Sequence, residues 1–122
     1  MGDDGANGEE ETQGQCFQRN NPMSDTAVTV LATIKVKPGM EDRARTLLSN
    51  VVSPTRDEPG CVTYDLHQST TDPTEFMFHE VWASVEALAA HSASPAPHRA
   101  ALRAELGALV AGAPSVTRWR RV

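Results

Sequence analysis

The chain has 122 residues and a formal net charge of −5 at pH 7, which is enough for one domain with a modest core. Residues 1–22 carry five acids and one base, so residues 23–122 are nearly neutral, with eleven acids and ten bases. A nearly neutral domain without a basic block lacks the many Lys and Arg contacts to phosphate that nucleic-acid binding requires.

The two cysteines, Cys16 and Cys61, have no zinc-ligand spacing, and Cys16 lies in the polar N-terminal segment. We therefore expect neither a structural disulfide nor a metal site. No apolar run approaches the roughly 18 residues of a membrane span, and the N-terminus lacks the apolar core of a signal peptide. These features predict a cytoplasmic protein that binds neither membrane nor nucleic acid.

Residues 1–22 ("MGDDGANGEEETQGQCFQRNNP") are rich in Gly, Glu, Gln and Asn and contain one aromatic residue. Such a segment buries too little apolar surface to offset the entropy that it loses on ordering. We predict a disordered acidic leader over residues 1–22 and a folded domain over residues 23–122.

The first predicted strand covers residues 27–36 ("AVTVLATIKV"), where β-branched residues alternate along the chain. Pro38 and Gly39 end it. Residues 53–60 ("SPTRDEPG") predict a loop or a short helical turn. Between them, apolar residues recur at the spacing of an amphipathic helix: Met40, Ala44, Leu47, Leu48 and Val51.

Two strand-like runs follow, "CVTYDLHQS" (61–69) and "EFMFHEVW" (75–82). The segment between them contains Asp72 and Pro73, which favour a turn, and its short length predicts a β-hairpin.

The last part of the chain predicts two helices and a strand. Ser84 stands at an N-cap position ahead of a helix over residues 85–91. A second helix is expected to end at Gly112, and "SVTRWRRV" (115–122) predicts the final strand.

The element order is thus β-α-β-β-α-β, which predicts an α+β ferredoxin-like fold. In this fold a four-stranded antiparallel sheet carries its helices on one face. Leu31, Met77 and Val81 or their neighbours indicate that the other face is apolar too. A homodimer packed sheet against sheet would cover that face.

Several short motifs occur in a fixed order: "VKPGMED", "EPGC" before the strand that carries Tyr64, the Asp-Pro turn, Glu80-x-Trp82, "SVEAL", and His91 ahead of "SP". Together they resemble the antibiotic biosynthesis monooxygenase (ABM) superfamily, in particular its small quinol-monooxygenase-like branch, over residues 27–122. The resemblance implies a dimeric α+β barrel. Members of the superfamily oxidise quinol-, anthrone- or naphthol-like substrates with O2 and without metal or flavin. Other members degrade haem, are isomerases or have no known activity.

The haem-degrading branch is not expected here. Its members resemble one another in an Asn on the first strand and an axial His in the last long helix. Ala32 and Ala101 stand at those places in this chain. We therefore expect no haem, and no other cofactor or metal.

The chain offers no nucleotide-binding loop and no nucleophile elbow. Its chemistry would rest on a base that deprotonates a phenol, polar groups that hold the developing charge, and a dry apolar pocket. We assign His91 as the base and Tyr64 and Glu80 as its polar partners in catalysis. The predicted substrate-binding residues are Trp82, Phe78, His98 and His67.

Each assignment has a structural alternative. His91 could pack at the sheet edge, and His98, on the core side of its helix, could be a purely structural histidine. Glu80 could pair with one of the arginines near the C-terminus or orient a histidine, because a buried Glu requires a partner. Trp82 could line a pocket or fill the core.

Tyr64 depends on the register of the hairpin. One register places Cys61, Thr63, Asp65 and His67 on the face of Glu80 and Trp82, and a shift by one residue places Val62, Tyr64, Leu66 and Gln68 there. The family pattern favours the second register, which leaves His67 and His79 on the opposite face or at the dimer interface.

We therefore expect a cofactor-independent monooxygenase that oxidises a quinol or polycyclic phenol with O2. One alternative is a non-catalytic dimeric domain that binds a small aromatic molecule. Another is an isomerase or an aldehyde-detoxifying enzyme on the same scaffold.

Overall fold

The computed structural model describes residues 26–122, so the predicted leader over residues 1–22 lies outside the described part of the chain. The elements follow the predicted order, and the segment over residues 53–60 contributes a short helix. Their bounds are β2 (Val28–Lys35), α2 (Glu41–Ser49), α3 (Val52–Arg56), β3 (Cys61–Gln68), β4 (Glu75–Trp82), α4 (Val85–Ala93), α5 (Pro97–Leu109) and β5 (Ser115–Trp119).

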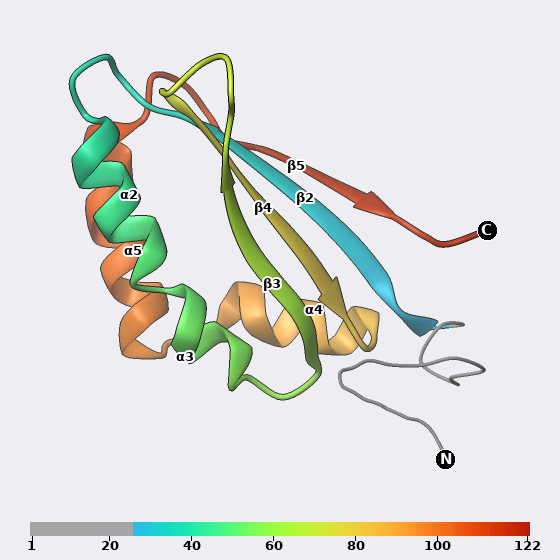
Figure 1. Ribbon diagram of the computed structural model, residues 1–122. Helices are drawn as coiled ribbons and strands as arrows, with labels where there is room; N and C mark the ends of the chain where they lie inside the picture. Colours follow the sequence, from blue (N-terminus) through green and yellow to red (C-terminus); the bar gives the residue numbers. More distant parts are fainter. Residues whose placement is uncertain (1–25) are drawn as a thin grey trace.

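The strands form one four-stranded sheet in the order β3-β4-β2-β5. Every neighbouring pair is antiparallel. Helices α2, α3, α4 and α5 lie on one side of this sheet (Figure 1). The predicted α+β ferredoxin-like fold is therefore confirmed.

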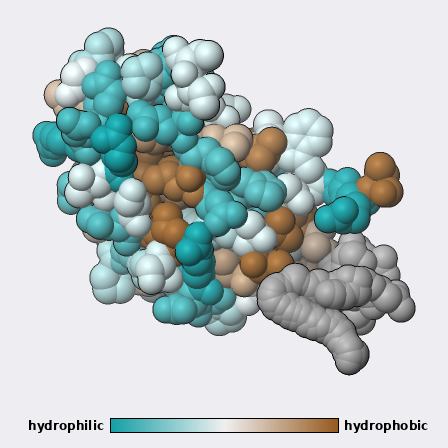
Figure 2. All heavy atoms as spheres, in the orientation of Figure 1, coloured by the Kyte–Doolittle hydropathy of each residue, from teal (hydrophilic) through white to brown (hydrophobic). Residues whose placement is uncertain are grey.

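The core lies between the helices and the sheet. In β4, four alternate residues are buried: Phe76, Phe78, Glu80 and Trp82. Successive side chains of a strand point to opposite faces, so this row faces the helices. Burial of one large apolar side chain contributes about 1.5–3 kcal/mol, so a row of three aromatic residues anchors β4. In the space-filling view, hydrophobic residues gather between α2 and the sheet and along the strands (Figure 2).

The pairing of β3 with β4 decides between the two hairpin registers that the sequence allowed. Tyr64 pairs with Glu80, and Leu66 pairs with Phe78. Tyr64 is buried on the same face as Glu80, as the family pattern predicted. A bulge between Cys61 and Thr63 lets Cys61 pair with Trp82.

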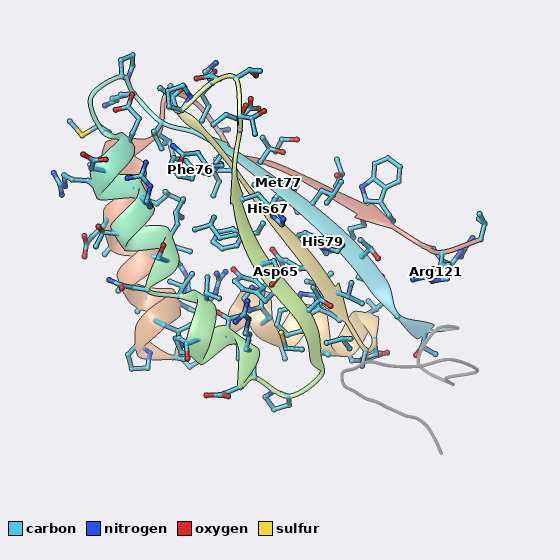
Figure 3. All side chains as sticks on the ribbon, viewed as in Figure 1. Asp65, His67, Phe76, Met77, His79 and Arg121 are labelled. Atoms are coloured by element: carbon cyan, nitrogen blue, oxygen red, sulfur yellow. The ribbon has the colours of Figure 1, made fainter. Side chains whose placement is uncertain are left out.

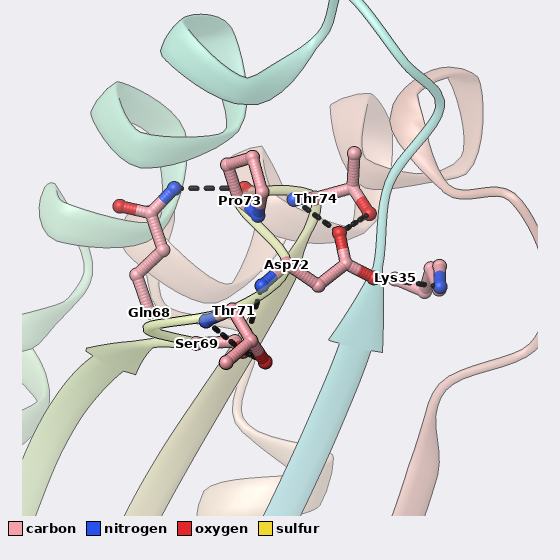
Figure 4. Close-up of polar contacts among 7 residues, drawn as sticks. All are labelled: Lys35, Gln68, Ser69, Thr71, Asp72, Pro73 and Thr74. Atoms are coloured by element: carbon pink, nitrogen blue, oxygen red, sulfur yellow. Dashed lines mark hydrogen bonds and ion pairs between the residues drawn. The ribbon is translucent and has the colours of Figure 1, made fainter.

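The hairpin turn is closed by side chains (Figure 4). Oδ1 of Asp72 accepts hydrogen bonds from the backbone N–H of Thr74, at 3.0 Å, and from its hydroxyl, at 2.6 Å. Oδ2 of Asp72 pairs with Nζ of Lys35 at 2.8 Å. Gln68 Nε2 donates to the carbonyl of Pro73 at 2.7 Å. The predicted Asp-Pro turn therefore also connects the hairpin to β2.

Two helix boundaries test the capping predictions. The Ser84 side chain accepts a 3.0 Å hydrogen bond from the N–H of Ala87, which confirms the N-cap of α4. Helix α5 ends at Leu109, before the predicted stop at Gly112. Val110 is extended and forms an isolated bridge with Val36, so pairing with the end of β2 competes with a further helical turn.

Within residues 26–122, no helix has the length and apolar character that crossing a membrane requires.

Candidate active site

A cavity of about 170 Å³ lies on the helix-facing side of the sheet. Its walls are mostly aliphatic side chains and Phe78, and they come from β2, β3, β4, α4, α5 and the segment before β5. The polar residues that line it are Tyr64, Glu80, His91, Ser92 and Arg99. Three other hollows are larger, about 280, 430 and 540 Å³, but they are more open to solvent. The 170 Å³ cavity is partly open, since exposed Ser92 and Val116 also line it, but it is the better candidate because Tyr64, Glu80 and His91 converge there.

Four rings form the wall of the site beside this cavity. Tyr64 stacks on Phe78 with ring centroids 4.8 Å apart, and Trp82 lies against His91 with centroids 4.5 Å apart. Tyr64 meets the edges of Trp82 and His91 at 6.5 and 5.8 Å. The predicted residues Phe78, Tyr64, Trp82 and His91 are thus brought together. Stacked and edge-on contacts of this kind hold rings in fixed positions.

Glu80 is 5% exposed, and its Oε1 accepts a 2.9 Å hydrogen bond from the indole N–H of Trp82. Burial raises the pKa of Glu80, and the Trp82 bond and the positive charge of Arg99 oppose that rise. Within residues 26–122, no ion pair includes Glu80. The observed partner of the carboxylate is therefore the indole of Trp82.

His91 is 5% exposed, and its Nδ1 lies 2.8 Å from Oε1 of Glu58. A carboxylate only accepts hydrogen bonds, so Nδ1 carries the proton and Nε2 of the neutral ring holds the lone pair. Burial lowers the pKa of His91, and the contact with Glu58 opposes that effect. His91 can therefore serve as a neutral base.

His98 contacts the same carboxylate, with its Nε2 2.6 Å from Oε2 of Glu58. It does not line the 170 Å³ cavity. Instead it lines the 430 Å³ surface groove between α2 and α5. His98 was predicted to face the core side of its helix. Its side chain is mostly buried, but it contacts Glu58 and lines the groove.

His67 is separated from the other candidates. It is exposed and lies on the opposite face of the sheet, paired with Met77 (Figure 3). The same alternation that buries Tyr64 directs His67 away from the helices. His79 lies on that outer face as well, as expected.

Two residues of the site, Glu58 and Arg99, were not among the sequence candidates. The Nε atom of Arg99 is buried and has no hydrogen-bond partner among the described residues. Arg99 precedes Leu102 by three positions, so helical periodicity places it on the buried side of α5. Glu58 is the first residue of the "EPGC" motif, but its position in the sequence does not predict that two distant histidines, His91 and His98, are its partners.

Burial also raises the pKa of the Tyr64 hydroxyl, although the positive charge of Arg99 opposes the rise. The phenol of Tyr64 therefore stays protonated and can donate a hydrogen bond. Arg99 and Tyr64 give the cavity two donors for a developing negative charge. Among the described residues, no cluster of three or more His, Cys, Asp or Glu could hold a metal ion.

Comparisons with known proteins agree with this architecture. The solved structure of PA3566 from Pseudomonas aeruginosa is 30% identical and superimposes with a TM-score of 0.74, covering 81% of this chain and 97% of that one. A structure described as an antibiotic biosynthesis monooxygenase is 32% identical, has a TM-score of 0.72 and is covered over 98% of its length, against 78% of this chain.

Two relatives match by sequence. Rv0793 of Mycobacterium tuberculosis is 37% identical over 90 residues, which cover 74% of this chain and 86% of the relative. The protein sll1783 of Synechocystis is 35% identical over 75 residues, which cover 62% of this chain and 51% of sll1783. This chain therefore spans about half the length of the second relative. The family model for antibiotic biosynthesis monooxygenase matches residues 27–104. The chain belongs to the antibiotic biosynthesis monooxygenase (ABM) family.

Proposed function

We propose that the chain is a cofactor-independent monooxygenase that oxidises a quinol-type phenol with O2. The observation that supports this most directly is the position of His91. Its Nδ1 is held by Glu58, while its ring lines an apolar cavity that also contains Arg99 and Tyr64. A base and two hydrogen-bond donors in a largely apolar pocket are the groups that phenol deprotonation requires.

In this reaction Nε2 of His91 takes the phenolic proton, and Arg99 and Tyr64 stabilise the resulting oxyanion. The electron-rich anion then reduces O2. One oxygen atom enters the ring and the other leaves as water, so that a quinol becomes a hydroxyquinone. The substrate supplies all four electrons.

The cavity volume bears on substrate size. A cavity of about 150 Å³ lined by aliphatic and aromatic side chains binds one benzene ring, and this cavity measures about 170 Å³. We infer that the cavity takes the single ring of a quinol, whereas a polycyclic phenol would extend through its open side.

Oxygen uptake with a panel of single-ring quinols tests the proposal. His91→Gln should lower the rate by about 100-fold or more, the contribution typical of a general base. His79→Gln is the matched control, because it makes the same change on the outer face of the sheet. Equal rates for wild type and His91→Gln would eliminate the base role. Tight binding of a phenol without oxygen uptake would instead favour the non-catalytic binding domain.

We also infer that the protein forms a homodimer through the outer face of the sheet. Leu31, Met77 and Val81 are only partly buried on that face, and Trp119, at its β5 edge, is 55% exposed. An apolar face of this kind favours a covering partner. Met77→Lys should shift the sedimentation coefficient to that of a monomer, while Arg103→Ala, on the exposed side of α5, should leave the dimer intact.

A further inference from the structure

Glu58 connects two histidines that come from different helices. It lies in the turn between α3 and β3, and its side chain is 13% exposed. Oε1 lies 2.8 Å from Nδ1 of His91 on α4, and Oε2 lies 2.6 Å from Nε2 of His98 on α5. One carboxylate is therefore shared by two imidazoles.

The two histidines contact different spaces. His91 lines the 170 Å³ cavity, and His98 lines the surface groove between α2 and α5. Glu58 consequently stands between the proposed reaction site and the surface. Among the described residues, this groove is the one larger hollow lined by a side chain that hydrogen-bonds Glu58.

The charges around the cluster permit one mobile proton. Glu58 supplies one negative charge, and two imidazolium rings on the same carboxylate would repel each other. On the cavity side, Arg99 and Glu80 face His91. On the groove side, Asp42 and Arg43 of α2 and Glu105 of α5 surround His98, and Asp42 is paired with Arg45.

We propose that Glu58 and His98 keep His91 neutral, with its Nε2 lone pair free, because at rest the proton of this cluster is held on His98. This proposal rests on the proposed function of His91. When Nε2 of His91 takes the proton of the phenol, His98 releases a proton to solvent in the groove. His91 becomes positive as His98 becomes neutral, so the net charge of the three residues does not change. No proton has to cross Glu58. When His91 protonates the oxygen-derived product it returns to its neutral form, and His98 takes a proton back from solvent, which restores the resting state.

The burial of the two rings supports this direction. A charge on His91 would lie beside Trp82 and Tyr64 in the apolar wall, where desolvation penalises it. A charge on His98 is less desolvated, because this side chain is 13% exposed and lines a surface groove. Glu58 and His98 are thus positioning residues, because they act on the reaction through His91.

Histidine titrations followed by NMR in the full chain test the link without any need for turnover. His98→Gln removes the competing cation and leaves Glu58 to His91 alone, so the His91 pKa should rise by about one unit. Glu58→Gln should lower it. Glu105→Gln is the control, because it removes a titratable group from the same groove without touching Glu58. A shift in His98→Gln no larger than that in Glu105→Gln would overturn the proposal.

The pH profile of quinol oxidation provides the second measurement. The acid limb of the pH profile of kcat/KM reports the pKa of the essential base in the free enzyme. His98→Gln should therefore move that limb to higher pH by the same amount as the change in the His91 pKa measured by NMR. A loss of packing alone would lower the rate without moving the limb, and that result would also overturn the proposal. If wild type oxidises no quinol, the proposed function fails, and the NMR titration still decides whether Glu58 couples the two histidines.

Discussion

The indole N–H of Trp82 donates a 2.9 Å hydrogen bond to Oε1 of Glu80, two residues earlier on the same strand. Both side chains are buried on the helix-facing side of β4. The Trp82 ring also lies against His91, with centroids 4.5 Å apart. Trp82 therefore satisfies a buried carboxylate and at the same time supports the ring of His91, although it does not itself line the cavity.

Trp82→Phe tests the hydrogen bond while keeping an aromatic ring. A buried acceptor that loses its donor costs about 1–3 kcal/mol, and the free energy of unfolding should fall by that amount. The pKa of Glu80 should rise further, because the bond that opposes desolvation is lost. Urea unfolding and an NMR titration of the carboxyl group measure the two effects.

Trp119→Phe is the matched control for this change. Its indole N–H also bonds a residue two positions earlier, Thr117, but the acceptor is a hydroxyl on the outer face of the sheet and not a buried carboxylate. Trp119→Phe leaves no buried charge without a donor, so its effect on the free energy of unfolding should be smaller. Equal losses in the two variants would show that burial of Glu80 is not the cause.

Glu80→Gln should change how stability depends on pH. A carboxyl whose pKa is higher in the folded than in the unfolded chain binds its proton more tightly when folded. The stability that the protonated Glu80 contributes is fully present at pH values below the ordinary carboxyl pKa of 4.5. It is lost as the pH rises through the raised pKa of the folded protein. At pH 7 wild type therefore contains a desolvated charge that Glu80→Gln removes.

The variant should consequently be more stable than wild type at pH 7, and its advantage should disappear below about pH 4, where Glu80 is protonated in both states. Each unit of the pKa difference corresponds to about 1.4 kcal/mol. Urea unfolding at several pH values measures the difference, with Glu105→Gln as the exposed control. A difference that does not vary with pH would contradict the prediction.

The strand part of the site could be predicted from the sequence. Alternation alone placed Phe78, Glu80 and Trp82 on one face, since the period of a strand is two residues. The hairpin register that adds Tyr64 was a choice between two options, because a shift of one residue reverses every side chain. Only the observed Tyr64–Glu80 pairing settles it.

The loop and helix part of the site could not be predicted in this way. Glu58 meets His91 across 33 residues of sequence and His98 across 40. Such contacts depend on how α4 and α5 pack against the turn between α3 and β3. The spacing of apolar residues along one helix or strand does not predict that packing. Arg99 was missed for another reason: its spacing to Leu102 places it on the buried side of α5, but an Arg on a helix is usually solvated. Its buried Nε, which has no hydrogen-bond partner among residues 26–122, is what identifies it.

Cys61 should be an unreactive thiol in the folded chain. Burial, with the nearby charges of Glu58 and Glu80, raises its pKa from 9.0 to about 12. A three-unit rise lowers the thiolate fraction about 1000-fold, and the thiolate is the reactive form. In a Cys16→Ser background, alkylation by iodoacetamide at pH 8 should be slower by at least that order in the native than in the unfolded chain. Comparable rates in the two states would show that water reaches the thiol.

Gly60 should tolerate substitution less well than Gly39. Both have positive φ, 83° and 92°, where an alanine costs about 1–2 kcal/mol. A Cβ on Gly39 meets nothing within 4 Å, whereas a Cβ on Gly60 would lie 2.4 Å from the Cβ of Ala87 on α4. Overpacking of this kind costs a further 1–3 kcal/mol, roughly. Urea unfolding should therefore show a larger loss for Gly60→Ala than for Gly39→Ala.

Ala87→Gly identifies the source of that extra loss. On its own it should cost about 1 kcal/mol, the difference in helix propensity between Gly and Ala. Combined with Gly60→Ala it removes the clashing methyl group, so the double variant should be more stable than the sum of the two single losses predicts. The same clash would displace α4, which carries His91, relative to the turn that carries Glu58. Quinol oxidation should thus fall in Gly60→Ala and recover in the double variant. Strictly additive losses would mean that strain at the positive φ, rather than contact with α4, makes glycine necessary at this position.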